Sequence, residues 1–185
     1  MKNLCLGILA GALVSALACA TARAESYRYV RWIGLDRLTI EQPVGSASKG
    51  RIVVANDAFF QTNFCETSDD YYCFFSAQDA FAVPKALRSN TRDWTVRGVR
   101  FELVERNVSV SVFGRKIDGL SVIRRPVNTT VAAEKPWLFL YSSRDGLVAF
   151  GSEDLRSTYW LEGDVGFGSE ARRTSSTKDR VEQHP

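Results

Sequence analysis

The chain has 185 residues, of which 45% are hydrophobic and 24% charged, and its formal net charge is +3. Without residues 1–24 it keeps 22 basic and 21 acidic residues, a net charge of about +1, so the basic stripe of a nucleic-acid-binding protein is not expected. The single histidine, His184, stands beside Pro185, so no metal site, cofactor or histidine-based catalytic site is expected.

Residues 1–24 are typical of a signal peptide. Lys2 supplies a positive start, Leu4 to Ala20 form an apolar run, and Ala22-Arg23-Ala24 matches a small-x-small cleavage site. We therefore expect a mature chain that begins at Glu25, is periplasmic or secreted, and has no transmembrane segment.

The cysteines divide between the leader and the mature chain. Cys5 and Cys19 leave with the leader, which leaves Cys65 and Cys73 as an even pair in a compartment that permits disulfides. The two are predicted to be bonded; free thiols would need a reducing compartment. A lipoprotein acylated at Cys19 is a minority alternative, because Ala16 precedes it by three positions where leucine is usual.

The first part of the mature chain alternates strand-like and loop-like segments. Residues 27–33 and 38–40 are rich in aromatic and branched side chains and predict a strand or a bent hairpin. Residues 43–50 are rich in Gly and Ser and predict a loop, after which residues 51–55 predict a short strand.

The stretch around the two cysteines is predicted to be a hairpin. Turn-forming residues 67–70 lie midway between Cys65 and Cys73. If the cysteines face each other, Phe64 lies opposite Phe74 on the face away from the sulfurs. Closing so short a loop contributes about 2 to 3 kcal/mol to stability by restricting the unfolded chain.

The tip of this hairpin is the candidate partner-contact site, formed by Glu66, Asp69, Asp70, Tyr71 and Tyr72. Tyrosines on a rigid loop offer a large contact area at little entropic cost. The alternative is purely structural: Tyr72 and its neighbours pack on the domain while the acids keep the turn soluble.

The middle of the chain is predicted to hold helix and then a meander. Residues 76–90 carry a capping pattern and a proline suited to a first helical turn, so one or two short helices are expected there. Residues 99–103 and 108–112 alternate apolar and polar side chains and predict two strands separated by Asn107. Asp118-Gly119 predicts a hairpin turn before a strand at residues 120–123.

The last part predicts another hairpin and a tail. Residues 137–141 and 147–150 flank a turn, and the first arm is apolar on both faces, as in a central strand. Residues 158–161 predict a last strand, and residues 169–185 lose apolar side chains and are predicted to be disordered.

Together these elements predict a mainly β (α+β) fold. We expect a single small antiparallel β-barrel or sandwich-like domain at residues 25–168, with one or two short helices. The side chains expected to point inward are Val99, Phe101, Val110, Trp137, Phe139, Val148 and Phe150.

Two functions remain open. The first is a non-catalytic binding module of a bacterial envelope, such as a carrier, an enzyme inhibitor or an immunity-type protein, with an unknown protein or small-molecule ligand. The alternative is a carboxylate-dependent hydrolase of envelope glycans, using acids such as Asp118, Asp145, Glu153 and Asp154. Solvated turn residues explain these acids better, so no catalytic residue is assigned.

Overall fold

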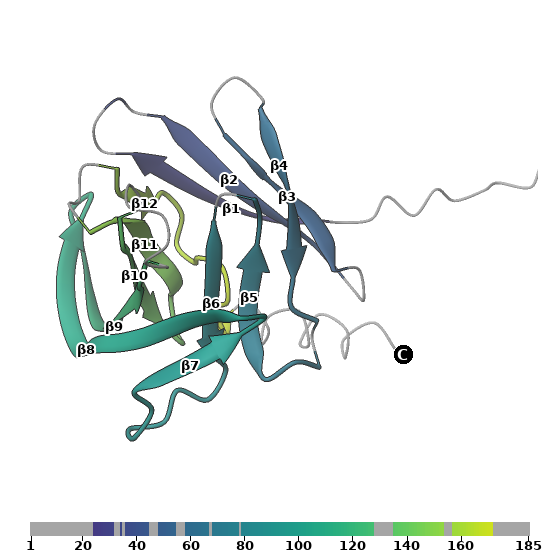
Figure 1. Ribbon diagram of the computed structural model, residues 1–185. Coiled ribbons are helices and arrows are strands. Elements are labelled where there is room, and N and C mark those ends of the chain that lie inside the picture. The colour runs from purple at the N-terminus through teal and green to yellow at the C-terminus, as the bar shows by residue number, and fades with distance from the viewer. Residues whose placement is uncertain are drawn as a thin grey trace, which may run out of the picture.

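The computed structural model describes residues 24–31, 34, 36–44, 48–54, 58–66, 68–77, 79–127, 135–153 and 157–171. Residues 1–23, including Cys19, and residues 172–185 of the predicted tail at 169–185 lie outside this part of the chain. Twelve strands form one antiparallel sheet in the order β6-β5-β4-β3-β2-β1-β12-β11-β10-β9-β8-β7. The sheet curls into a nearly closed barrel (Figure 1). The mainly antiparallel β class is therefore confirmed, in a barrel larger than expected.

The connections are those of an up-and-down meander. Each strand pairs with its neighbour in sequence, except that β6 and β7 do not pair and β1 pairs with β12. The strands are β1 (Ala24–Arg31), β2 (Arg37–Pro43), β3 (Lys49–Val53), β4 (Phe59–Phe64), β5 (Tyr71–Phe75), β6 (Ala80–Pro84), β7 (Asp93–Val96), β8 (Val99–Val112), β9 (Arg115–Arg125), β10 (Trp137–Ser142), β11 (Gly146–Ser152) and β12 (Tyr159–Leu161). The seam of the barrel therefore lies between β6 and β7.

A side chain bridges this seam. The indole Nε1 of Trp94 in β7 donates a hydrogen bond to the carbonyl oxygen of Ala82 in β6, at 3.0 Å. The β7–β8 hairpin crosses β6 and β5 (Figure 1), and the Arg97 guanidinium at its turn lies 5.2 Å from the centre of the Phe75 ring. Cys73 and Ala82, which pair in register, are both buried. Both faces of β5 and β6 are thus covered.

The predicted helices at residues 76–90 are wrong. The described residues of this segment form β6 and turns, and all but the last residue of β6 are buried. Ser76 and Asp79, which resemble a helix cap in sequence, close the β5–β6 turn: Ser76 N donates to Asp79 O at 2.8 Å, and Asp79 N donates to Ser76 Oγ at 2.9 Å. Because both faces of β6 are covered, its sequence shows no alternation that would mark a strand.

Aromatic side chains fill the interior. The ring of Phe167, from the segment after β12, lies 5.4 to 6.2 Å from the rings of Tyr27, Phe64, Phe74 and Phe81. Leu147 N donates to Phe167 O at 2.9 Å, which fastens this segment to the start of β11. Segment 163–170 therefore contributes a central residue of the core, where the sequence suggested only a boundary loop.

The β8–β9 hairpin is longer and more bent than predicted. β8 is one strand of 14 residues, and Asn107 lies within it at a left-handed φ of 57°. Asp118 and Gly119 lie within β9, with Gly119 at φ 74°, and the turn is instead formed by Phe113 and Gly114. The register of the β8–β9 pair shifts between Leu103 and Val110, so the two predicted breaks are bulges that bend the hairpin.

The outer half of this hairpin covers a second apolar cluster, which contains Ile117, Leu120 and Val148 with Val108, Val110 and Leu140 packed against them. Arg115 near the tip donates to Asp145 Oδ1 at 2.9 Å and to Asp164 O at 3.0 Å. Of the residues predicted to point inward, Phe101, Phe139 and Phe150 are in the main core and Val99 and Trp137 pack against it. Val110 and Val148 belong to the second cluster instead.

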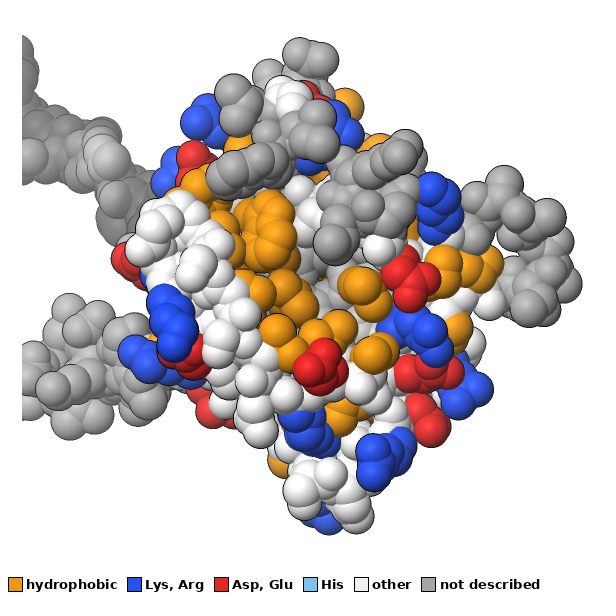
Figure 2. All heavy atoms as spheres, turned by 90° about the vertical axis from the view of Figure 1, so that its left-hand side faces the viewer, with side chains coloured by type: hydrophobic (Ala, Val, Ile, Leu, Met, Phe, Trp, Pro, Cys, Tyr) orange, Lys and Arg blue, Asp and Glu red, His pale blue; other side chains and the backbone are white. Residues whose placement is uncertain are grey.

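The surface carries apolar as well as charged side chains. Figure 2 shows the side on which Figure 1 places β8 to β12, where hydrophobic side chains gather in the middle and charged ones lie mostly around them. Within the described ranges, four large hydrophobic side chains are more than half exposed: Val44, Phe59, Val104 and Phe113. They come from separate parts of the sheet, so they do not by themselves mark one binding site.

Candidate functional site

The β4–β5 hairpin is closed by the predicted disulfide. The sulfur atoms of Cys65 and Cys73 lie at bonding distance, with the Cα atoms 5.1 Å apart, and Cys65 N donates to Cys73 O at 3.1 Å. Phe64 pairs with Phe74 as predicted, and both rings point into the core. The bond therefore joins two strands that are anchored by their aromatic side chains.

The turn beyond the disulfide is held by one of the predicted contact residues. Asp69 Oδ2 accepts a hydrogen bond from Glu66 N at 2.8 Å, and Asp69 N donates to Glu66 O at 3.1 Å. A carboxylate that accepts from the backbone in this way stabilises a turn. Asp69 is thus a structural residue of the tip.

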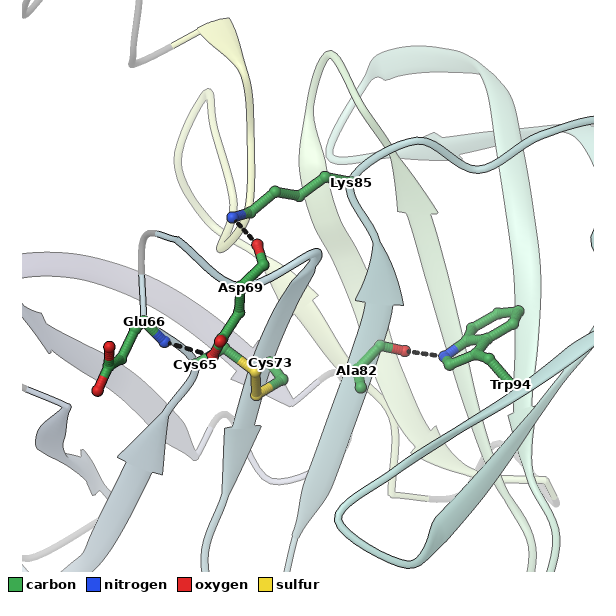
Figure 3. Close-up of a disulfide and its surroundings, with 7 residues drawn as sticks. All are labelled: Cys65, Glu66, Asp69, Cys73, Ala82, Lys85 and Trp94. Carbon is green, nitrogen blue, oxygen red and sulfur yellow. Dashed lines mark hydrogen bonds between the residues drawn. A yellow bond between two sulfur atoms is a disulfide. The ribbon is translucent and has the colours of Figure 1, made fainter.

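Lys85, just after β6, clamps the same turn from the side. Its Nζ donates to Asp69 O and lies 5.6 Å from the centre of the Tyr72 ring, while its backbone N donates to Asp70 O at 2.9 Å. Figure 3 shows the Lys85 side chain reaching across to the tip beside the disulfide. Sequence reasoning missed Lys85, because it stood in a predicted helix and no local pattern connects it to the tip.

The predicted contact residues differ in exposure. Glu66 and Asp70 are exposed, and Asp69 and Tyr71 are half-buried. Tyr72 is 8% exposed and packs against Gly168, where an added Cβ would lie 3.1 Å from the tyrosine Cγ. For Tyr72 the structural alternative therefore applies, and the surface available at the tip consists of Glu66, Asp70 and part of Tyr71.

The candidate acids of the hydrolase hypothesis have separate structural partners. Asp118 in β9 accepts from Ser109 Oγ at 2.5 Å, and this bond, with help from Lys116, holds the pKa of the Asp118 carboxyl below its usual value. Asp145 is buried in the β10–β11 turn and accepts from Arg115 and from Ser142 Oγ.

Glu153 is exposed beyond β11, and Asp154 lies outside the described residues. The acids that the structure describes thus make contacts typical of turns and strand ends, not of a general acid–base pair. This arrangement gives the hydrolase hypothesis no geometric support.

Within the described ranges, no three His, Cys, Asp or Glu side chains come together in a way that could hold a metal ion. No helix in that part of the chain has the length and apolar character needed to cross a membrane. Comparisons with protein-family models, with curated proteins and with solved structures found no match for this chain.

Proposed function

We propose that this chain is an exported, non-catalytic binding module of the inhibitor or immunity type, and that the tip of the β4–β5 hairpin contacts its protein partner. The tip here means residues 66–70 with Tyr71. Export is proposed from the leader-like residues 1–24, and a disulfide in the mature chain is consistent with a periplasmic or secreted location.

The observation that carries the proposal is the combination of a fixed backbone and exposed acidic side chains. The disulfide, the Asp69 turn and the Lys85 clamp hold the backbone, while Glu66 and Asp70 extend from it into solvent. A loop that is already ordered loses little entropy when it binds. A fixed loop of this kind is suited to recognising one partner surface.

The packing of the interior favours an inhibitor or immunity-type protein over a carrier. A carrier barrel needs a cavity for its ligand. Here the centre of the barrel is occupied by Phe167 and the aromatic rings around it. Recognition is therefore assigned to the outer surface.

The charge of the tip indicates the chemistry of the partner. Glu66 and Asp70 provide two exposed carboxylates within five residues of chain, and Tyr71 supplies an aromatic ring beside them. Complementary charges speed association and orient partners. We therefore expect a partner with a basic surface and an apolar rim.

The test is capture of envelope proteins by the double variant Glu66→Gln/Asp70→Asn. A matched control, Asp93→Asn/Asp164→Asn, removes two exposed carboxylates elsewhere, since the Asp93 side chain is 54% exposed and the Asp164 side chain is fully exposed. We expect the wild type and the control to retain the same partner and the tip variant to lose it, with all three melting at similar temperatures. Retention by the tip variant, or equal loss in the control, would refute the proposal.

A further inference from the structure

A polar cavity of about 270 Å³ lies beside the tip, at the end of the barrel where β6, β8, β9 and β10 come together. Its walls come from stretches far apart in sequence: Pro84, Lys85, Leu87, Arg106, Asn107, Gly119, Ser121, Tyr141, Ser142, Ser143 and Glu170. Convergence of two cations, one acid and several hydroxyl groups on one hollow is typical of a site for a small polar ligand. Of these wall residues, Lys85 also holds the tip, but the exposed carboxylates of the tip proposal, Glu66 and Asp70, do not line the cavity.

Arg106 is the best-defined charged group of the cavity. Its Nη2 donates to the carbonyl oxygens of Arg88 and Thr91, at 2.6 and 3.3 Å. These bonds fix the plane of the guanidinium, and no acidic side chain in the described part of the chain forms an ion pair with Arg106. Nε and Nη1 remain available to donate to a ligand.

The bulge in β8 explains why this arginine faces the cavity. Upstream, Leu103 pairs with Ile123, and downstream, Val108 pairs with Leu120 in the second apolar cluster. The register shifts between them, where Asn107 takes a left-handed conformation. The bend therefore directs the Arg106 side chain toward the loop at residues 88–91 and the cavity. In a regular strand without the bulge, the side chain would point in a different direction.

We propose that the cavity binds a small molecule through a carboxylate group held by Arg106. Arginine binds carboxylates through parallel charge-assisted hydrogen bonds, which are stronger than bonds between neutral groups. Glu170 and the serine hydroxyls lie on the same walls and can accept from hydroxyl or amino groups elsewhere on the ligand. The volume suits a metabolite-sized molecule, not a macromolecule.

The experiment compares succinate with its uncharged diamide, titrated into isotopically labelled full-length protein at constant ionic strength. We expect succinate to shift the backbone amide signals of Asn107, Gly119 and Ser143 in a saturable manner, and the diamide to leave them unchanged. The affinity for succinate should fall as salt is raised, because the interaction is ionic.

Two variants test the assigned residues. Arg106→Gln should weaken succinate binding at least tenfold, while Arg100→Gln, which removes an exposed arginine on the same strand paired with Asp93 and Glu102, should not. Since Arg106→Gln also removes two bonds to the 88–91 loop, Ser143→Tyr provides an independent variant that occludes the exposed mouth of the cavity and should weaken binding as well.

Equal shifts with the diamide, shifts confined to other parts of the barrel, or unchanged affinity in both cavity variants would overturn the assignment. The tip variant Glu66→Gln/Asp70→Asn leaves the cavity walls intact and should still bind succinate. Failure of the cavity proposal and failure of the tip proposal are thus distinguished in the same set of proteins.

Discussion

The hydroxyl of Tyr29 joins the first strand to the segment that contains Phe167. It accepts a hydrogen bond from Phe167 N at 3.1 Å and donates one to Leu147 O at 3.0 Å. Tyr29 is fully buried, and burial raises the pKa of its hydroxyl, so the proton stays in place for the second bond. One side chain thus satisfies two buried backbone groups from two distant parts of the chain.

Replacing Tyr29 by Phe should therefore be costly. The variant keeps the ring but removes the hydrogen bonds of the hydroxyl to the buried Phe167 N and Leu147 O, at a cost of about 1 to 3 kcal/mol. Denaturant unfolding measures this loss. Tyr159→Phe is the control, since the Tyr159 hydroxyl makes no hydrogen bond within the described residues, and equal costs in both variants would contradict the assigned role.

Phe167→Ala tests whether the segment after β12 belongs to the core. The ring is 2% exposed and lies among four other aromatic rings, so its removal leaves a cavity, and we expect a loss of about 3 to 5 kcal/mol. Phe59→Ala, where the ring is 51% exposed beside Arg51, should cost about 1 kcal/mol or less. Similar melting temperatures for the two variants would show that the segment is peripheral.

The importance of Phe167 could not be predicted from the sequence around it. Segment 163–170 holds Gly163, Gly166 and Gly168, and its hydrophobic residues are Val165 and Phe167, a composition typical of a linker. Gly166 is required because an added Cβ would overlap the backbone carbonyl of Leu147. Such close approach is a property of the folded chain, and the local pattern does not contain it.

Strand pairing could be predicted where sequence patterns were local. The spacing of Cys65 and Cys73 predicted the register of β4 and β5, alternation predicted Phe101 as a core residue, and the apolar arm at residues 137–141 predicted Phe139. The predictions failed where tertiary contacts override propensity: β6 is covered on both faces, and Asn107 adopts its left-handed conformation within a strand. At the candidate site, the disulfide tip was predictable, whereas Lys85 joins it only through the fold.

Removing the disulfide should lower stability while leaving the fold in place. For Cys65→Ala/Cys73→Ala we expect a loss of about 2 to 3 kcal/mol, mainly because the unfolded chain becomes less restricted. Differential scanning calorimetry of the double variant and of the oxidised wild type measures the difference. Since Phe64 and Phe74 still pack in the core, the near-ultraviolet circular dichroism of the variant should match the wild type below its melting temperature. A variant as stable as the oxidised wild type would contradict the prediction.

Asp79, in the β5–β6 turn, is a source of pH-dependent instability. Its Oδ1 is buried and has no hydrogen-bond partner among the residues that the structure describes. Burial raises the pKa of the Asp79 carboxyl, and the charge of Arg125 offsets this only in part. The folded state therefore holds the proton more tightly than the unfolded state does.

The sign of the effect follows from proton linkage. Well below the ordinary aspartate pKa of 3.8, both states are protonated and Asp79 costs nothing through its charge. As the pH rises past that value, the unfolded chain releases its proton before the folded chain does. The free energy of unfolding therefore falls as the Asp79 carboxyl ionises. Asp79→Asn should therefore raise the melting temperature at pH 7 and leave it unchanged near pH 3.

Asp118→Asn is the contrasting variant, since hydrogen bonds from Ser109 and Lys116 lower the pKa of its carboxyl. Its stabilising contribution is present above the ordinary pKa and is lost as the pH falls through the lowered one, so this variant should melt slightly lower than the wild type at pH 7. The Asp118 side chain is 58% exposed, which keeps the effect small. A gain for Asp79→Asn that persists undiminished at pH 3, or a loss at pH 7, would show that ionisation of the buried carboxyl is not what destabilises the turn.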